Sequence, residues 1–320
     1  SGSFTSSIIH KGGVSRICAL NDKGDYVSVS RYGEITQWNY ASGKWDKQLL
    51  SSNSACSYRD MCIDGEGVIY ALSYNGLLQS VVGKQVAQPI TLPESKGWTR
   101  LFPIGNNRLL LSSASSLYIF DTVSRMVVAS IQVPQEITTL GKKGDRVMVF
   151  GKKGGIWSVG KDAKLKAEEI STRGIVTAFT WYKEKNLSAI GLENGDILVF
   201  DASGNSRGKL VGHSSRVTDL HFVDNFLFSS SYDRVVNIWD VNATNSEAVS
   251  INDFTSWVYC MCSNDKKALF IGEQSGKVSR IVVSPSEMAK TIHSNLKRDF
   301  TDDEWAYYVG KNVPRIKLKN

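Results

Sequence analysis

The stretch that decides the fold runs from Gly212 to Asp240 and reads GHSSRVTDLHFVDNFLFSSSYDRVVNIWD. A Gly-His pair opens it, and a Trp-Asp pair closes it 26 residues after the histidine. Apolar and polar residues alternate between the two pairs, as expected for short β-strands. Buried polar groups are costly unless they are paired, so we expect a hydrogen-bonded network inside one small sheet. Its four members are His213, Ser229, Asp233 and Trp239.

The spacing of this stretch recurs along the chain. Short apolar strands end at seven positions that are 39 to 43 residues apart: Trp38, Val81, Phe120, Val159, Phe200, Trp239 and Ile281. An inner strand is expected to begin 22 to 24 residues before each of them, near Val14, Tyr58, Trp98, Ile137, Val176, Val217 and Trp257. Five residues before five of these ends stands a glycine, which tight hairpins favour at positive φ. The repeat therefore predicts seven similar four-stranded units.

Residues 212–240 resemble a WD repeat, the four-stranded blade of a β-propeller. This resemblance implies an all-β, seven-bladed propeller that occupies residues 4–294. An N-terminal strand completes the last blade in that family, so we expect Thr5–His10 to close the ring and cover its open edge. Residues 289–294 are an alternative for this role, although their apolar spacing favours a helix. The sixth repeat is the one that carries the full signature, so the resemblance conveys more about fold than about function.

The segment after the repeats, residues 295–320, has a different character. Thr301 and Glu304 form a capping box, and Trp305, Tyr308 and Val309 fall on one face of a predicted amphipathic helix. The motif KRDFTDDEWAYYVGKNVPRI resembles the C-terminal signature of bacterial STAND-type signal-transduction NTPases, with an arginine in place of the usual aromatic residue after the proline. We expect Trp305 and Tyr308 to dock, either onto the propeller itself as a latch or onto a partner.

Composition is that of a β-rich, turn-rich domain with no break into separate domains. No apolar run approaches the length of a membrane helix, and residues 1–3 look like a cloning remnant, so we expect the natural protein to extend further toward its N-terminus. The five cysteines are odd in number and fall on predicted inner strands. We interpret them as buried apolar residues in a reducing, cytoplasmic compartment, with no metal site and no cofactor.

A binding face is predicted where the hairpins and the starts of the inner strands gather at one end of the ring. Arginine, tyrosine and tryptophan are the residue types enriched at interface hot spots. The predicted partner-binding face comprises Arg16, Arg31, Tyr74, Trp98, Arg100, Lys152, Tyr232, Trp257 and Tyr259. An alternative for Trp98 and Trp257 is the core between blades, where aromatic residues at strand starts commonly pack.

The net charge of +7 comes largely from the lysine-rich turns of residues 142–166. Such a patch can attract an acidic protein or a phosphate backbone, but no recognition motif for nucleic acid accompanies it. Hydrolase elbows, zinc-protease motifs and phosphate loops are absent from the sequence, so catalysis ranks low. We expect a non-catalytic interaction or sensor domain, which the tail resemblance places in a bacterial signalling or defence ATPase. The alternative is a free-standing scaffold subunit that binds other proteins.

Overall fold

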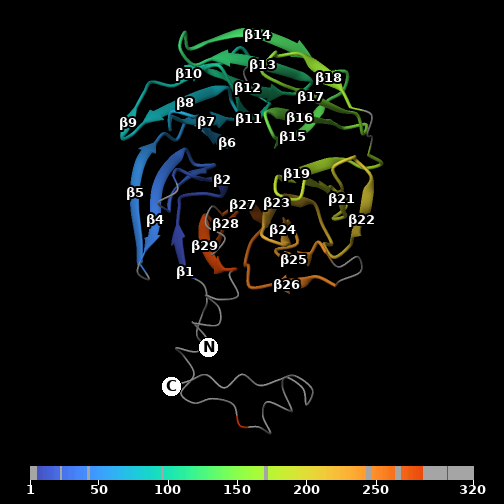
Figure 1. The fold of residues 1–320 in the computed structure, drawn as a ribbon. Coiled ribbons are helices and arrows are strands. Elements are labelled where there is room, and N and C mark those ends of the chain that lie inside the picture. Colours follow the sequence, from blue (N-terminus) through green and yellow to red (C-terminus); the bar gives the residue numbers. More distant parts are fainter. Residues whose placement is uncertain are drawn as a thin grey trace.

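The backbone forms a ring of seven antiparallel sheets around a common axis (Figure 1). This computed structural model of the chain describes residues 6–21, 24–41, 44–94, 97–168, 172–242, 247–263, 268–283 and 301. Each sheet is one blade, and its strands run from the axis outward in sequence order, except in the last blade. The seven-bladed propeller predicted from the repeat is confirmed. The predicted tail helix with Trp305 and Tyr308, and residues 289–294, lie outside the described residues.

The first four blades contain seventeen short strands, because the outer edge of blade 2 is divided in two. Blade 1 contains β2 (Val14–Ala19), β3 (Asp25–Ser30), β4 (Glu34–Ala41) and β5 (Lys44–Ser52). Blade 2 contains β6 (Tyr58–Ile63), β7 (Ile69–Ser73), β8 (Leu77–Val82), β9 (Gln85–Val86) and β10 (Ile90–Thr91). Blade 3 contains β11 (Trp98–Gly105), β12 (Arg108–Ser113), β13 (Ser116–Asp121) and β14 (Met126–Gln132). Blade 4 contains β15 (Ile137–Lys143), β16 (Arg146–Gly151), β17 (Ile156–Val159) and β18 (Leu165–Ala167). The last piece of blade 1 is also its longest strand.

The remaining three blades repeat this plan, and the last one borrows a strand from the N-terminus. Blade 5 contains β19 (Val176–Tyr182), β20 (Leu187–Leu192), β21 (Ile197–Phe200) and β22 (Ser206–Leu210). Blade 6 contains β23 (Val217–Val223), β24 (Phe226–Ser231), β25 (Val236–Asp240) and β26 (Val249–Ile251). Blade 7 contains β27 (Val258–Cys262), β28 (Ala268–Glu273), β29 (Lys277–Val282) and β1 (Ser6–Ile9). Blade 7 therefore joins the two ends of the described propeller.

Ring closure follows from the pairing of β1 with β29. The two strands are antiparallel, with Ser6 opposite Arg280 and Ile9 opposite Lys277. The prediction that an N-terminal strand forms the outer edge of the last blade is confirmed, with Thr5 outside the described residues. Closing the ring through an early strand leaves β29 with partners on both sides, so its backbone groups do not form an open edge.

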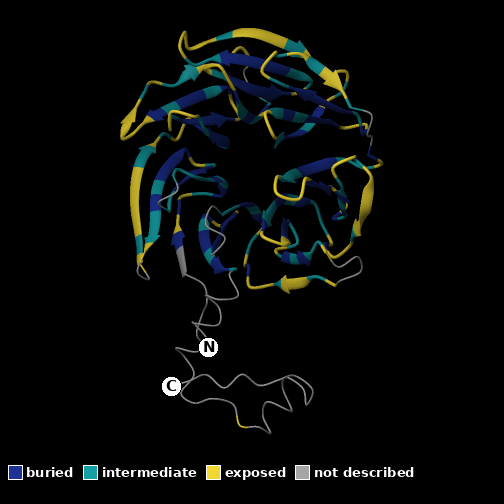
Figure 2. Ribbon diagram, in the orientation of Figure 1, coloured by how far each residue is buried: buried dark blue, intermediate teal, exposed yellow. Residues whose placement is uncertain are grey.

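The hydrophobic core is divided among the junctions between blades instead of lying at one centre. Seven buried clusters occur, and each combines side chains from two neighbouring blades. The two middle strands of each blade are mostly buried, and the outermost strands are largely exposed (Figure 2). Because each blade is covered by a neighbouring blade on both faces, the side chains on both faces of its middle strands must be apolar.

The hairpins between the second and third strands explain the repeated glycines. Gly33, Gly76, Gly154, Gly195 and Gly276 all adopt positive φ, as the hairpin interpretation requires. Each also lies where a Cβ would collide with a carbonyl oxygen of the loop that enters the next blade; at Gly195, in blade 5, that oxygen belongs to His213. The glycines thus satisfy two constraints, backbone conformation and close approach of a second loop. In blades 3 and 6 the positive φ falls on Ala114 and Arg234.

A β-bulge recurs at the start of every inner strand. The register shifts within the first three residues of each one, as between Val14 and Arg16 in β2 and between Val217 and Asp219 in β23. The same irregularity occurs in β6, β11, β15, β19 and β27. A bulge places two residues opposite one and redirects a side chain. Seven bulges around one axis therefore redirect seven side chains at the same end of the ring.

Candidate functional site

The predicted network of blade 6 is present as a continuous chain of hydrogen bonds. The ring of His213 contacts Asp233 Oδ2 through Nδ1 at 2.9 Å and Ser229 Oγ through Nε2 at 2.8 Å. Trp239 donates its indole N–H to the same Ser229 oxygen at 2.8 Å. Burial acts to raise the pKa of Asp233, but hydrogen bonds from His213 and from two backbone N–H groups hold it below its ordinary value. The network fixes the loop that enters blade 6 against its hairpin.

A second network of this kind lies in blade 1 and was missed in the sequence. His10 Nε2 lies 3.1 Å from Ser28 Oγ, and Trp38 donates to that oxygen at 2.9 Å. The fourth member differs, because Glu34 Oε2 is 3.8 Å from His10 Nδ1, which has no hydrogen-bond partner among the described residues. The signal was available: His10 precedes Val14 by the offset that separates His213 from the start of β23.

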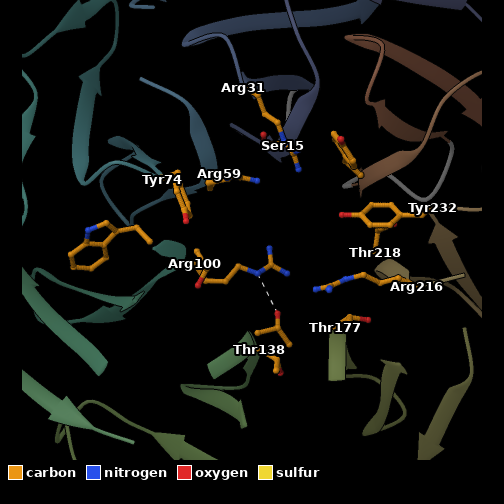
Figure 3. A pocket seen from close by; sticks show the side chains of 14 residues that line it. Ser15, Arg31, Arg59, Tyr74, Arg100, Thr138, Thr177, Arg216, Thr218 and Tyr232 are labelled. Carbon is orange, nitrogen blue, oxygen red and sulfur yellow. Dashed lines mark hydrogen bonds between the residues drawn. The ribbon is translucent and has the colours of Figure 1, made fainter. Parts of the chain in front are cut away.

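A pocket of about 290 Å³ opens on the axis, at the end of the ring where the hairpins lie (Figure 3). Residues from blades 1 to 7 contribute to its wall: Ser15, Arg31, Arg59, Tyr74, Trp98, Thr99, Arg100, Thr138, Thr139, Thr177, Arg216, Thr218, Tyr232 and Tyr259. The set contains four arginines, and it lacks aspartate, glutamate, histidine and cysteine. Such a wall presents hydrogen-bond donors and positive charge, with no carboxylate, imidazole or thiol among its side chains.

The bulges build this pocket. The first residue of every inner strand belongs to a buried cluster between blades: Val14, Tyr58, Trp98, Ile137, Val176, Val217 and Val258. The second residue of every inner strand lines the pocket: Ser15, Arg59, Thr99, Thr138, Thr177, Thr218 and Tyr259. In blades 3 and 4 the third residue, Arg100 or Thr139, also reaches the wall. Consecutive residues thus face one cavity, which a regular strand would not allow.

Two arginines and two aspartates form a buried ion-pair cluster beneath the mouth. Arg16 lies 3.2 Å from Asp60 Oδ1 through Nε and 3.5 Å from Asp219 Oδ2 through a terminal nitrogen. Arg100 lies 3.6 Å from the same Asp60 oxygen. Burial acts to lower the pKa of Arg16, but the carboxylates of Asp60 and Asp219 outweigh burial and raise it. The pKa of Arg100 is lowered by burial and by the positive charge of Arg16. The cluster is formally neutral, since two charges of each sign offset one another.

The arginines at the mouth are not balanced in this way. Arg216 lies 3.5 Å from Glu193, but within the part of the chain that the structure describes neither Arg31 nor Arg59 forms an ion pair. Their guanidinium groups stack instead on tyrosine rings, 4.1 Å above the centre of Tyr259 and 4.9 Å above that of Tyr74. Burial, followed by the charge of Arg31, lowers the pKa of Arg59. Figure 3 shows the four arginine side chains directed into the pocket from different blades.

An aromatic strip borders the pocket on the side of blades 6 and 7. Tyr232 stacks on Trp257 with ring centres 4.8 Å apart, and its edge meets Tyr259 at 5.9 Å. Trp257 is 43% exposed although it lies next to a buried inner strand. An exposed tryptophan held by a stacked neighbour is a preorganised apolar contact for another molecule.

The structure separates the residues of the predicted binding face. It brings Arg31, Tyr74, Arg100, Tyr232 and Tyr259 together in the wall of the pocket. Trp257 stands beside them, and Arg16 belongs to the ion-pair cluster below.

Two members of the predicted face are placed differently. Lys152 pairs with Glu136 at 2.8 Å on an exposed hairpin of blade 4 and is not part of the wall. Trp98 borders the pocket but packs in the core between blades, which is the alternative that the sequence left open. Its side chain is fully buried, packs on Tyr118 and donates to the carbonyl of Glu94, because the first position of each inner strand is a core position.

The main omissions of the sequence interpretation are Arg59, Arg216 and the threonines of the wall. Arg59 and most of the threonines were missed because the bulge displaces the cavity-facing position to the second residue of each strand, whereas Arg216 directly precedes β23. The start of β27 was also set one residue early, at Trp257 instead of Val258. Tyr259 therefore belongs with Ser15 and Arg59, and not with Arg16 as the sequence suggested.

Metal ligation finds no support in the geometry. Among the residues with described positions, no group of three or more His, Cys, Asp or Glu side chains is arranged to hold a metal ion. All five cysteines have free thiols, and burial raises the pKa of Cys260 well above its ordinary value, which keeps the thiol protonated. No helix in the described ranges is long and apolar enough to cross a membrane.

Comparisons with known proteins find similarity to WD repeats in part of the chain. Residues 204–240 match the family of the WD domain, G-beta repeat. The chain is 28% identical over 90 residues to DDB1- and CUL4-associated factor 10 of Xenopus laevis, covering 27% of this chain and 20% of that protein. It is 27% identical over 103 residues to WD repeat and SOCS box-containing protein 1 of Xenopus tropicalis, covering 31% of this chain and 24% of that protein. The chain thus spans a quarter or less of these relatives.

Among solved structures, the WD40 β-propeller domain of Doa1 superposes with a TM-score of 0.72. The superposition covers 88% of this chain and 97% of that domain, at 15% sequence identity. Identity at this level shows a shared fold and leaves function open. The chain is therefore a seven-bladed β-propeller in which residues 204–240 match the WD repeat.

Proposed function

We propose that this propeller is a non-catalytic interaction module that binds a protein partner at the mouth of its channel. The observation that supports this most directly is the convergence of arginine and tyrosine side chains from different blades on one open pocket beside the exposed Trp257. These residue types carry most of the binding energy in protein interfaces. The wall also lacks carboxylate, imidazole and thiol side chains, the groups that most often act as general acid, general base or activated nucleophile.

The relatives are compatible with this proposal. One of them is named as a factor associated with two other proteins, DDB1 and CUL4. A rigid ring whose loops vary while the blades keep their packing suits such an adaptor, because binding at the loops leaves the scaffold unchanged. The partner of the present chain need not be the same, since the alignment covers only part of each protein.

A mutational comparison tests the proposed face. A partner captured with the intact chain is purified, and its dissociation constant is measured by calorimetry. We expect Arg31→Ala with Tyr232→Ala to weaken the complex by at least about 2 kcal/mol without loss of thermal stability. The matched control is Arg207→Ala with Val249→Ala, on the exposed outer strands of blades 5 and 6. If the control variant lost affinity while the Arg31→Ala, Tyr232→Ala variant bound as tightly as the wild type, the interface would lie elsewhere.

A second setting is favoured by the sequence of residues 297–316 alone. Their resemblance to the C-terminal signature of bacterial STAND-type NTPases suggests a sensor domain in a signalling or defence ATPase, whereas the relatives named above are eukaryotic. Except for Thr301, these residues lie outside the described ranges. The complete gene distinguishes the settings, because an upstream G-x-x-x-x-G-K-[ST] phosphate loop is required by the ATPase and not by a scaffold subunit.

A further inference from the structure

The pocket contains more arginine side chains than there are carboxylates nearby to pair with them. Asp60 and Asp219 balance the two arginines of the lower cluster, and Glu193 lies beside Arg216. Arg31 and Arg59 remain without a carboxylate partner in the described part of the chain. Two guanidinium charges held near one another in a partly buried site destabilise the empty protein. An arrangement of this kind is typical of a site that is completed by an anion.

Hydrogen-bond donors point to the same conclusion. The Nε atoms of Arg31 and Arg59 are buried and have no acceptor among the described residues. The threonine hydroxyls of the wall are already engaged: Thr177 contacts the carbonyl oxygen of Val217 at 2.6 Å, and Thr218 contacts that of Val258 at 2.7 Å. The unsatisfied groups of the pocket are therefore arginine N–H donors, which require acceptor oxygens from a ligand.

We propose that the pocket binds a phosphate monoester carried by a phosphorylated side chain of the protein partner. This inference rests on the proposed interaction function and specifies what the partner presents. A phosphate monoester carries about −1.5 to −2 charges at neutral pH and three acceptor oxygens, which matches two unpaired guanidiniums. A carboxylate supplies half of that charge. Arginine is also the side chain best suited to bind phosphate with two parallel hydrogen bonds.

Size and surroundings favour a phosphorylated protein segment over a larger free ligand. The volume of about 290 Å³ lies at the lower limit of pockets for drug-sized ligands, so it suits one modified side chain. The exposed Trp257 and its stacked neighbour Tyr232 lie beside the opening, where residues flanking the phosphate would contact them. Stacking on Tyr259 and Tyr74 restrains Arg31 and Arg59 before binding, which reduces the entropy lost when the phosphate enters.

The first experiment uses inorganic phosphate as the probe and thermal unfolding of the full chain as the readout. We expect millimolar phosphate, at constant ionic strength, to raise the unfolding midpoint of the wild type and of the control variant Arg207→Gln. It should leave the midpoint of Arg31→Gln with Arg59→Gln unchanged, because a ligand stabilises only the state that binds it. Without phosphate, the double variant should be at least as stable as the wild type, since it loses two unpaired charges. Equal shifts in all three proteins would overturn the proposal.

The second experiment identifies the source of the phosphate. A degenerate pool of short peptides centred on phosphothreonine is compared, by fluorescence anisotropy, with the same pool bearing threonine or glutamate. We expect binding of the phosphorylated pool alone, weakened at least about tenfold in the double arginine variant and unchanged in Arg207→Gln. Equal binding of all pools, no binding of any pool, or stronger binding of free inositol phosphates than of the peptides would overturn the assignment.

A phosphatase treatment separates this inference from the proposed function. The captured partner is dephosphorylated and its affinity is measured again with wild type and with Tyr232→Ala. Loss of binding after dephosphorylation supports the phosphate site. Undiminished binding that still depends on Tyr232 would refute the phosphate site and leave the interaction face intact. Binding that responds neither to dephosphorylation nor to either set of variants would refute both.

Discussion

Protonation of His10 is expected to make the stability of the propeller depend on pH. The imidazole is almost fully buried between β3, β4 and the ring-closing strand, and Nδ1 has no hydrogen-bond partner among the described residues. Burial, with a smaller contribution from the charge of Lys47, lowers the pKa of His10 from 6.5 to about 4. The folded state therefore resists a proton that the unfolded chain accepts readily.

The sign and size of the effect follow from linkage. Above the unfolded pKa of 6.5 the ring is neutral in both states, and its contribution to stability is constant. Between 6.5 and about 4 the unfolded chain binds a proton that the folded chain does not, so the free energy of unfolding falls as the pH falls. With these two pKa values, lowering the pH from about 7.5 to about 5 costs roughly 2 kcal/mol.

Urea denaturation of wild type and His10→Gln across this pH range measures the effect. Glutamine does not titrate, so the difference between the two proteins isolates His10 from other groups, including His221, whose pKa burial also lowers. We expect the stability difference to change by about 2 kcal/mol in favour of the variant as the pH falls. Parallel curves would show instead that Glu34, 3.8 Å from Nδ1, accepts the protonated ring as an ion pair.

Three further predictions concern the blade network, the hairpins and the basic turn. Trp239→Ala should lower the free energy of unfolding by about 3 to 5 kcal/mol and Asp233→Ala by about 1 to 3 kcal/mol, and unchanged thermal midpoints in both would argue against a stabilising network. Gly195→Ala should cost more than about 1 kcal/mol in chemical denaturation because of its positive φ and the adjacent carbonyl, whereas Gly65→Ala, in open space, should be close to neutral. Lys152→Glu should reduce the association rate with an acidic partner and the salt dependence of that rate, with little change in the dissociation rate, as measured by stopped-flow kinetics. A faster dissociation with an unchanged association rate would show instead that Lys152 is part of the contact.

The fold was predictable from sequence because propeller blades repeat three local requirements. Apolar residues alternate in the strands, hairpins need glycine at positive φ, and the spacing between blades is nearly constant. Six of the seven predicted starts of inner strands coincide with the observed ones, and the seventh differs by one residue. Each requirement acts within a few residues or between neighbouring blades, so one sequence suffices to detect it.

The site was less predictable because it depends on a bulge that has no simple residue signature. Counting along a regular strand placed Arg16 on the predicted binding face, whereas the structure places it in the ion-pair cluster below the pocket. The hairpin positions Arg31, Tyr74 and Tyr232 do not depend on the bulge, and they were placed at the pocket. Apart from the hairpin residue Lys152, which lies outside the wall, the misplaced residues belong to the segment where backbone register departs from regular alternation.

The same bulge explains how a propeller with weak repeats can keep its fold while its pocket changes. The first residue of each inner strand, such as Val14 or Val217, packs between blades, and its replacement by a small or polar group would open a cavity or bury an unpaired group. The next residue, such as Arg59 or Thr138, belongs to none of the seven core clusters and borders the pocket. Substitution there changes charge and hydrogen bonding at the mouth and leaves the apolar packing between blades in place, although Thr177 and Thr218 also hydrogen-bond to the next blade. Adjacent positions are therefore under different constraints, and Arg59 occupies a position where packing between blades does not require an apolar side chain.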